Sequence, residues 1–283
     1  MAQQGTILVT GATGQIGREL VQLLRRDGAP FRAFVRDLVR ARASLGAGVE
    51  LVQGDLADPS SLARALEDID TVFLLSNNPS LEMSVVDEAI KRQVRRLVKS
   101  SAVGFKDQPP AGHGAVEEAI RRSGLTFTVL RPNAFMQTLA VYLPKLIGED
   151  NTFALPAGEG STAWVDTRDI AATAAALLQQ HGHDNKVYEV TGPEALSMGD
   201  VAEILTEVTG TPTRYRAVPP EEAQRELRAC GMEQMAGFLV EHYGAVERGG
   251  FKRVSDTVES VTGAQPRNFT AFATEHREMW RSN

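Results

Sequence analysis

Cysteine is almost absent from this 283-residue sequence, in which Cys230 is the only one. A single thiol excludes an internal disulfide and any metal site built from several cysteines, and it is typical of a protein from a reducing compartment. We expect Cys230 to be a packed, unreactive residue, because no histidine partner for a nucleophile can be identified from the sequence.

Long apolar segments are also lacking. The longest run lies near residues 170–178 and is much shorter than the roughly 20 residues that a membrane-spanning helix needs. The first residues, MAQQGT, have neither the charged nor the apolar region of a signal peptide. These absences predict a soluble, cytoplasmic protein with no membrane partner.

The charged residues form no long run of one sign. Lys and Arg number 30 and Asp and Glu number 36, so the net charge is −6 and no basic patch for a nucleic acid is evident. Hydrophobic residues at 42% and charged residues at 23% are ordinary for a globular protein, and the length suits one large α/β domain with an added lobe. We therefore expect a small-molecule substrate as the partner, and no sequence motif fixes an oligomeric state.

A regular alternation of two kinds of segment fills the first half of the chain. Short β-branched or apolar runs predict strands at residues 6–10, 31–35, 49–54, 71–75, 96–100 and 126–131. Amphipathic stretches between them predict helices near residues 16–26, 37–45, 60–66, 83–92 and 115–122. Right-handed crossovers then give a doubly wound parallel sheet, the Rossmann-type arrangement of an α/β protein.

Three glycines at intervals of three residues, Gly11, Gly14 and Gly17, follow the first predicted strand and precede the first helix. In a dinucleotide-binding loop the first glycine permits the tight turn, the second lets the backbone approach the pyrophosphate, and the third lets the helix pack on the strand. The helix N-terminus adds N–H groups and a positive dipole end. A mere turn is the alternative; we assign cofactor contacts to Gly11, Thr13, Gly14, Gln15, Ile16 and Gly17.

The residues after the second predicted strand decide between the two nicotinamide nucleotides. NAD(H) needs an acidic side chain there for the adenosine ribose, whereas Arg36 comes first and can clamp the 2′-phosphate of NADP(H), with Arg40 one helical turn further on. Asp37 keeps NAD(H) as the less favoured choice, and a solvated surface charge is the alternative for Arg36. We expect NADP(H) as the cofactor.

Further cofactor contacts are expected at the carboxyl ends of the other strands, where such sheets bind their ligands. Asp55 and Leu56 follow the third strand at the expected place of the adenine, with a turn or helix cap as the alternative for Asp55. Ser76 and Asn77 follow the fourth strand and are expected beside the ribose or nicotinamide.

The alternation changes after residue 131. The sequence predicts an apolar helix at 135–147, a strand and a helix between 163 and 180, one more sheet strand at 187–191, and mostly helices from 197 onward with an extended piece at 215–218. We therefore predict an NADP(H)-binding Rossmann domain at residues 1–150, completed by 163–192. A mostly helical C-terminal lobe at 193–283 is expected to cover the substrate.

Several motifs together resemble one family. They are GATGQIG at residues 11–17, FRAFVRD at 31–37, LRPNAFM at 130–136, WVDTRDIA at 164–171 and YEVTG at 188–192. These segments are similar to the NmrA-like branch of the atypical short-chain dehydrogenases, over nearly the whole chain. The branch includes flavin-free NAD(P)H quinone reductases, azo- and triphenylmethane-dye reductases, and nonenzymatic NADP-sensing regulators, so the resemblance implies a Rossmann fold and a nicotinamide nucleotide.

The catalytic serine, tyrosine and lysine typical of short-chain dehydrogenases are only partly present. Ser100 or Ser101 stands at the position of the serine, and we assign Ser101 to catalysis and Ser100 to the cofactor site. The segment that would carry Tyr-x-x-x-Lys reads HGAVE, which disfavours ordinary alcohol dehydrogenation. His113 and Glu117, four residues apart on one helix, can instead orient each other with His113 as the proton donor. A helix-start histidine with a surface glutamate is the alternative.

Hydride transfer to a quinone, an azo bond or a dye cation does not require a strong protein acid, because these electron-poor groups accept hydride readily. The protein then has to seat NADPH and present a flat apolar pocket over its nicotinamide. We expect substrate contacts at Asn133, Phe135, Met136 and Trp164, with Met232, Met235, Phe238 and Tyr243 as further candidates. Plain core is the alternative for the apolar residues, and a turn is the alternative for Asn133.

Three functional hypotheses follow. The leading one is an NADPH-dependent reductase of quinone-like, azo or other conjugated acceptors that uses no metal and no bound flavin. The second is an NADP(H)-sensing regulatory protein without catalytic activity. The third, an epimerase or dehydratase of the extended short-chain type, is disfavoured by the missing tyrosine and lysine.

Overall fold

The computed structural model describes residues 5–104 and 112–280. The chain forms two compact units, the first made of Met1–Pro132, Thr167–Val190 and Thr257–Gly263, and the second of Asn133–Asp166, Thr191–Asp256 and Ala264–Asn283. This division differs from the expected domain limits of 1–150 and 193–283, which stay a prediction, because it assigns residues 133–150 to the second unit.

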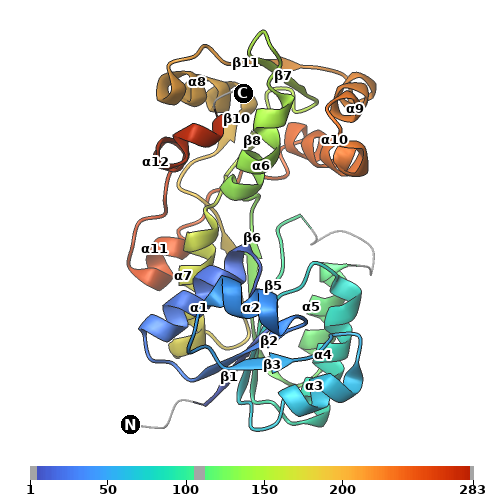
Figure 1. Cartoon of the computed structure of the whole chain (residues 1–283), viewed down its shortest axis with the longest axis vertical. Helices are drawn as coiled ribbons and strands as arrows, with labels where there is room; N and C mark the ends of the chain where they lie inside the picture. Colours follow the sequence, from blue (N-terminus) through green and yellow to red (C-terminus); the bar gives the residue numbers. More distant parts are fainter. Residues whose placement is uncertain (1–4, 105–111, 281–283) are drawn as a thin grey trace. The chain divides into compact units, whose positions relative to one another are not determined.

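A parallel seven-stranded sheet forms the centre of the first unit, in the order β3-β2-β1-β4-β5-β6-β9 (Figure 1). Its strands are β1 Ile7–Val9, β2 Phe31–Val35, β3 Leu51–Gln53, β4 Thr71–Leu74, β5 Arg96–Ser100, β6 Thr126–Pro132 and β9 Lys186–Val190. The strands predicted from the sequence are confirmed, with ends that differ by at most two residues. The fold class is therefore the expected Rossmann-type α/β sheet.

The strand order reverses between β1 and β4, because the chain runs outward from β1 to β3 and then returns to the other side of β1. In an open parallel sheet such a switch point leaves a crevice outside the carboxyl ends of the strands. Gly11 follows β1 and Ser76 follows β4, so the residues expected to bind a cofactor flank this point.

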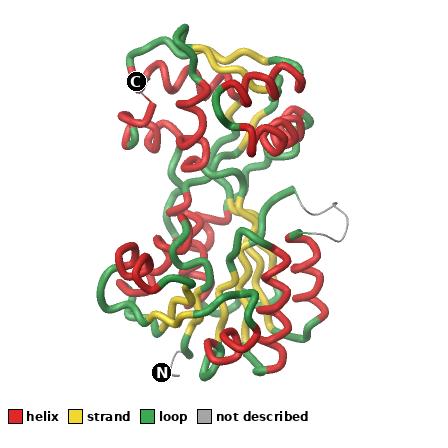
Figure 2. The backbone as a smooth tube through the Cα atoms, turned by 45° about the vertical axis from the view of Figure 1, so that its right-hand side comes forward, coloured by secondary structure: helices red, strands yellow, loops and turns green. Residues whose placement is uncertain are grey.

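Helices cover both faces of this sheet, as Figures 1 and 2 show. Helices α1, α7 and α11 pack together on one face, and α3, α4 and α5 on the other. The bounds in the first unit are α1 Gln15–Arg26, α2 Leu38–Leu45, α3 Pro59–Ala65, α4 Pro79–Lys91, α5 His113–Arg122, α7 Thr167–Gln179 and α11 Thr257–Thr262. Asp37, Asp58 and Asn78 begin α2, α3 and α4 by accepting backbone N–H groups, which explains these starts.

The second unit is mostly helical, as expected, and contains two small sheets. Its elements are α6 Met136–Leu146, β7 Thr152–Leu155, β8 Ser161–Thr162, β10 Leu196–Ser197, α8 Met198–Thr209, β11 Arg214–Ala217, α9 Pro220–Ala229, α10 Glu233–Glu247, α12 Phe269–Glu275 and the short 3-10 helix η1 Arg277–Trp280. β11 pairs with β7 in parallel, and β10 pairs with β8 antiparallel. A hydrophobic core with large aromatic side chains, among them Trp164, Tyr243 and Phe272, holds the unit together.

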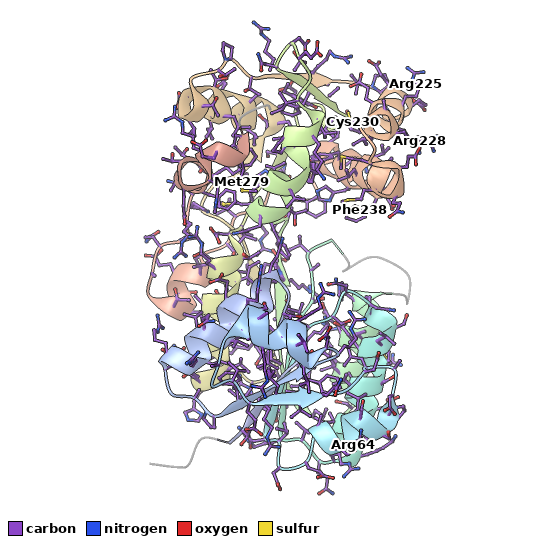
Figure 3. The ribbon with its side chains drawn as sticks, in the orientation of Figure 1. Arg64, Arg225, Arg228, Cys230, Phe238 and Met279 are labelled. Carbon is purple, nitrogen blue, oxygen red and sulfur yellow. The ribbon has the colours of Figure 1, made fainter. Side chains whose placement is uncertain are left out.

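Two surface properties bear on the expectations from the sequence. Cys230 follows α9 and is exposed (Figure 3), so the prediction that its thiol is packed is wrong. The residue after the last helical turn lies on the solvent side, which the hydrophobic pattern did not reveal. Within residues 5–104 and 112–280, no helix is both long and apolar enough to span a membrane.

Candidate active site

The glycine loop after β1 is shaped so that only glycine fits at two of its three positions. Gly11 has a φ of +63°, and a Cβ there would lie 2.7 Å from the Leu75 carbonyl oxygen. A Cβ at Gly17 would lie 2.1 Å from the carbonyl oxygen of Gly11, much closer than real Cβ atoms come. The loop closes with a 2.9 Å hydrogen bond from the Gly14 N–H to the Gly11 carbonyl. Gly11 and Gly17 therefore have the turn and packing roles that the sequence predicted.

Gly14 differs from these two glycines because its backbone conformation does not require glycine and the space around it is less crowded. Its φ of −76° and ψ of 177° suit any residue, and a Cβ would meet only the Gly11 carbonyl oxygen, at 3.2 Å. Thr13, Gly14 and Gln15 are exposed, whereas the side chain of Ile16 is buried. The missing side chain at Gly14 thus leaves an open face on the loop.

Helix α1 begins at this open face without a side-chain cap. Gly14 is its N-cap residue, and no acidic residue lies in the first turn. The first N–H groups of a helix have no partner within the helix, and the dipole makes this end positive. The loop and α1 together therefore form a site suited to a diphosphate.

Strand β2 is followed by an arginine and by an aspartate that caps the next helix. The Asp37 carboxylate accepts hydrogen bonds from the N–H groups of Val39 at 2.9 Å and Arg40 at 3.0 Å, so it caps α2. Arg36 is exposed, and its carbonyl accepts a hydrogen bond from the Gln53 side chain. The helix cap uses Oδ1 of this carboxylate, and the exposed guanidinium of Arg36 is the cationic group directly after the strand that suits an anionic ligand.

The two residues after β3 have local roles as well. The Asp55 carboxylate accepts the Ala57 N–H at 2.9 Å, which is the turn that the sequence left as an alternative. Leu56 is half-buried and packs against the hydrophobic core beneath it. Their contact with an adenine stays a prediction.

The loop after β4 is fixed by a buried carboxylate from α4. The Ser76 N–H donates to Oε1 of Glu82 at 3.0 Å, and the Ser76 hydroxyl accepts the Asn78 N–H at 3.0 Å. Asn77 between them is exposed. The loop expected beside the ribose or nicotinamide is thus fixed by a hydrogen bond to the Glu82 carboxylate.

Glu82 also pairs with a lysine that lies inside the sheet. The side chains of Lys99, on β5, and Glu82 are both fully buried, and Nζ donates to Oε1 of Glu82 at 2.9 Å. Nζ also donates to the Ser100 carbonyl and lies 3.3 Å from Nδ1 of His113, at the start of α5. Burial lowers the pKa of Lys99, and the Glu82 carboxylate offsets part of this effect. This cluster was not predicted from the sequence, although a lysine next to apolar residues of a central strand is an unusual signal.

A second buried carboxylate, Glu117, has partners other than His113. It accepts the Ser101 hydroxyl at 2.6 Å, a two-pronged contact from Arg131 at 3.0 and 2.5 Å, and Arg121 at 2.9 Å. Burial acts to raise the pKa of Glu117, but the hydrogen bonds from Arg131 and Ser101 outweigh it and hold the pKa below its ordinary value. An ionised carboxylate is therefore expected here.

These contacts correct the expected pairing of His113 with Glu117. The imidazole faces Lys99 and Glu82, whereas Glu117 joins β5 and β6 to α5 through Ser101 and Arg131. The Ser101 hydroxyl is engaged by this carboxylate, while the buried Ser100 hydroxyl has no hydrogen-bond partner among the described residues. The catalytic roles of His113, Ser101 and Glu117 and the cofactor role of Ser100 stay predictions.

The residues expected to contact the substrate lie in the second unit, and half of the eight belong to its hydrophobic core. Met136 and Trp164 are buried in its hydrophobic core, as are Met232 and Tyr243. Phe135 is half-buried at the start of α6. Of the further candidates, Met235 and Phe238 on α10 are exposed, Phe238 by 63% (Figure 3).

Asn133 is buried, and both ends of its amide are used within the unit. Its Nδ2 donates to the Phe251 carbonyl at 2.9 Å, and its Oδ1 accepts the Ala134 N–H at 2.8 Å. The side chain fixes the backbone where the chain leaves β6, as the alternative interpretation of a turn suggested. Its contact with a carboxamide stays a prediction.

The strand order and the glycine loop define a dinucleotide-binding Rossmann protein. A model of the NmrA-like family matches residues 3–273, so the chain belongs to this family. The resemblance seen in the motifs is thereby confirmed.

Three proteins illustrate what the chain is similar to. An NAD(P)H azoreductase of Xenophilus azovorans is 37% identical over 95% of this chain and 97% of that protein. A (4-alkanoyl-5-oxo-2,5-dihydrofuran-3-yl)methyl phosphate reductase of Streptomyces griseus is 35% identical over 97% of this chain and 99% of that protein. The solved structure of an NADPH-dependent quinone oxidoreductase of Escherichia coli, complexed with NADPH, has a TM-score of 0.88 and 26% identity over 96% of this chain and 99% of that one.

Proposed function

We propose that the chain is an NADPH-dependent reductase that transfers hydride to a quinone-like, azo or other conjugated small-molecule acceptor without a metal or a bound flavin. Its membership of the NmrA-like family and its relatives named as reductases identify it as an NAD(P)H-dependent oxidoreductase. The observation that carries the proposal is the open face at Gly14. The backbone does not require glycine there, and a Cβ would need a shift of only a few tenths of an ångström, so a ligand that approaches the loop explains the missing side chain.

The choice of cofactor rests on the end of β2. Asp37 is engaged as a helix cap, so Arg36 is the group that meets the adenosine ribose and favours a 2′-phosphate. The NADPH in the structure of the Escherichia coli relative supports the same choice. When bound, NADPH supplies the hydride.

The acceptor class rests on a property shared by the groups in the relatives' names. Azo compounds, quinones and an alkanoyl-substituted oxo-dihydrofuran are conjugated and electron-poor. Such a group accepts hydride before it is protonated, which suits a chain that reads HGAVE where short-chain dehydrogenases carry Tyr-x-x-x-Lys. Direct transfer between nicotinamide and acceptor needs neither a metal nor a flavin.

His113 is the residue of the first unit that we assign as the proton donor. A quinone that takes up a hydride becomes a hydroquinone anion, which then needs one proton. His113 is half-buried at the start of α5, and imidazole donates and accepts protons near neutral pH. Solvent is the alternative donor, and the two are separated by the His113 variant described below.

Steady-state oxidation of NADPH and NADH against a panel of quinones, azo dyes and activated unsaturated lactones tests the proposal. We expect turnover with NADPH, weaker turnover with NADH, and loss of both with Gly14→Asp. Tight binding of NADPH without oxidation by any acceptor would refute the reductase and favour the NADP(H)-sensing regulator instead.

A further inference from the structure

The ammonium group of Lys99 has an acceptor for each of its three N–H bonds. These acceptors are Oε1 of Glu82 at 2.9 Å, the Ser100 carbonyl, and Nδ1 of His113 at 3.3 Å. A buried ammonium needs all of its donors satisfied, because water cannot complete the set. Nδ1 serves as the third acceptor only if it carries no proton.

The opposite arrangement, with a proton on Nδ1, fits the distances less well. Its acceptor would be Oε2 of Glu82, which lies 3.6 Å from Nδ1 and is thus too distant for a hydrogen bond. Oε2 is buried and has no hydrogen-bond partner among the described residues. A protonated Nδ1 would be drawn to this carboxylate oxygen, so the gap between them indicates that Nδ1 accepts from Lys99.

Two charged groups that face the His113 ring come from elements packed against α5. Lys99 lies on β5 and Glu82 on α4, both fully buried. Glu117, on the same helix as His113, is engaged by Ser101 and Arg131. The Lys99–Glu82 pair therefore acts directly on Nδ1 and favours a ring proton on Nε2.

We propose that Lys99 and Glu82 are positioning residues that hold His113 in the neutral tautomer with its proton on Nε2. This inference rests on the proposed function, in which His113 protonates the reduced acceptor: Nε2 gives its proton to the hydroquinone anion while the Lys99 ammonium passes one to Nδ1, so the ring stays neutral and Lys99 becomes the amine. The same Glu82 oxygen holds the Ser76 N–H in the loop after β4. One buried carboxylate thus links the expected cofactor loop to the orientation of the proton donor.

In the variant Lys99→Met we expect the ring proton of His113 on Nδ1 and not on Nε2. With the ammonium gone, the Glu82 carboxylate stays beside Nδ1 and becomes the acceptor for a proton there. The double variant Lys99→Met with Glu82→Gln removes both charges, and the glutamine oxygen still accepts the Ser76 N–H. The double variant can still be measured if Lys99→Met alone does not fold because the buried Glu82 charge has lost its partner. The matched control is Asp70→Asn with Arg95→Gln, which removes an ion pair at the other end of β5.

Heteronuclear NMR of protein with isotope-labelled histidine measures the tautomer directly, without cofactor or substrate. His113 is one of five histidines, and its signals are assigned as those that vanish in His113→Gln. At about pH 8.5, above the ordinary pKa of histidine, we expect the proton on Nε2 in the wild type and the control. We expect it on Nδ1 in Lys99→Met, and a mixture in the double variant. A proton on Nδ1 in the wild type, or an Nε2 proton retained unchanged in both variants, overturns the proposal.

Kinetics separate this inference from the proposed function. In Lys99→Met the Ser76 N–H keeps its acceptor, so the KM for NADPH should stay within about 2-fold of the wild-type value. The kcat with a quinone should fall about 10-fold or more, because Nε2 loses its proton. A changed tautomer with an unchanged kcat overturns the positioning role in the reaction. If the wild type oxidises no NADPH, the proposed function fails, while the NMR result decides the tautomer independently.

Discussion

The variant Gly14→Asp tests the open face of the glycine loop most sharply, because the structure predicts loss of binding without loss of fold. The backbone angles at Gly14 suit any residue, and the new Cβ would meet only the Gly11 carbonyl oxygen, at 3.2 Å. A shift of a few tenths of an ångström relieves this contact. We therefore expect a thermal unfolding midpoint close to that of the wild type.

The loss of NADPH affinity follows from charge and bulk together. A carboxylate about 4 Å from a phosphate charge is repelled by about 1 kcal/mol in water and by about 4 kcal/mol at the effective dielectric constant of a protein surface. The side chain also blocks the approach of the diphosphate to the loop backbone. We expect binding to weaken about 100-fold or more in calorimetric titrations, since about 1.4 kcal/mol corresponds to a factor of ten.

Gly17→Ala is the matched control in the same loop. Its Cβ would lie 2.1 Å from the Gly11 carbonyl oxygen and 2.7 Å from the Cα of Ala12, so the loop has to move. Overpacking of this kind costs about 1–3 kcal/mol, which lowers the unfolding midpoint by roughly 2–12 °C. Unchanged NADPH binding in Gly14→Asp, or a midpoint lowered as far as in Gly17→Ala, would refute the reasoning.

Three further variants test individual side chains. Arg36→Ala should weaken NADPH about 10–100-fold and NADH little, because a charge-assisted contact with the 2′-phosphate contributes roughly 1.5–3 kcal/mol; equal losses in titrations of both nucleotides would contradict this. His113→Ala should slow quinone turnover about 100-fold at unchanged NADPH affinity, whereas a dye cation, which takes a bare hydride, should react nearly as before. An unchanged quinone rate would show that solvent supplies the proton. Because the pKa of Glu117 is held below 4.5, its stabilising contribution is complete above that pH and is lost as the pH falls through the lowered pKa. Urea unfolding should therefore show Glu117→Gln less stable than the wild type at pH 7, with the difference shrinking below pH 4.5; a constant difference would be the contrary result.

The sheet of the first unit could be predicted because its signals are local. Strands such as Phe31–Val35 and Thr126–Pro132 are apolar or β-branched runs bounded by helical stretches, and each one can be recognised from its own residues. The packing role of Gly17 could be predicted too, because the spacing of the glycines specifies the close approach of the helix to the loop that follows the strand. Helix starts were less certain, since α4 begins at Pro79 and not near residue 83.

The buried charges could not be predicted, because they depend on distant parts of the chain. Lys99 meets Glu82 across 17 positions, and Ser101 meets Glu117 across 16. Helical spacing suggested a His113–Glu117 pair. Instead His113 lies beside charged groups of β5 and α4, and Glu117 binds the arginine of β6. Core residues could not be told from substrate-contacting residues among the apolar candidates for a similar reason. Met136 is buried and Phe135 is half-buried, although both belong to one apolar run.

The central claim is that this chain passes hydride from NADPH directly to a conjugated acceptor. The most direct measurement uses purified protein from which flavin and metals have been removed, mixed with NADPH and a limiting amount of quinone. We predict that one NADPH is oxidised for each quinone reduced, at a rate that neither added flavin nor a metal chelator changes. Oxidation that begins only after flavin is added, or firm NADPH binding without any oxidation, would contradict the account.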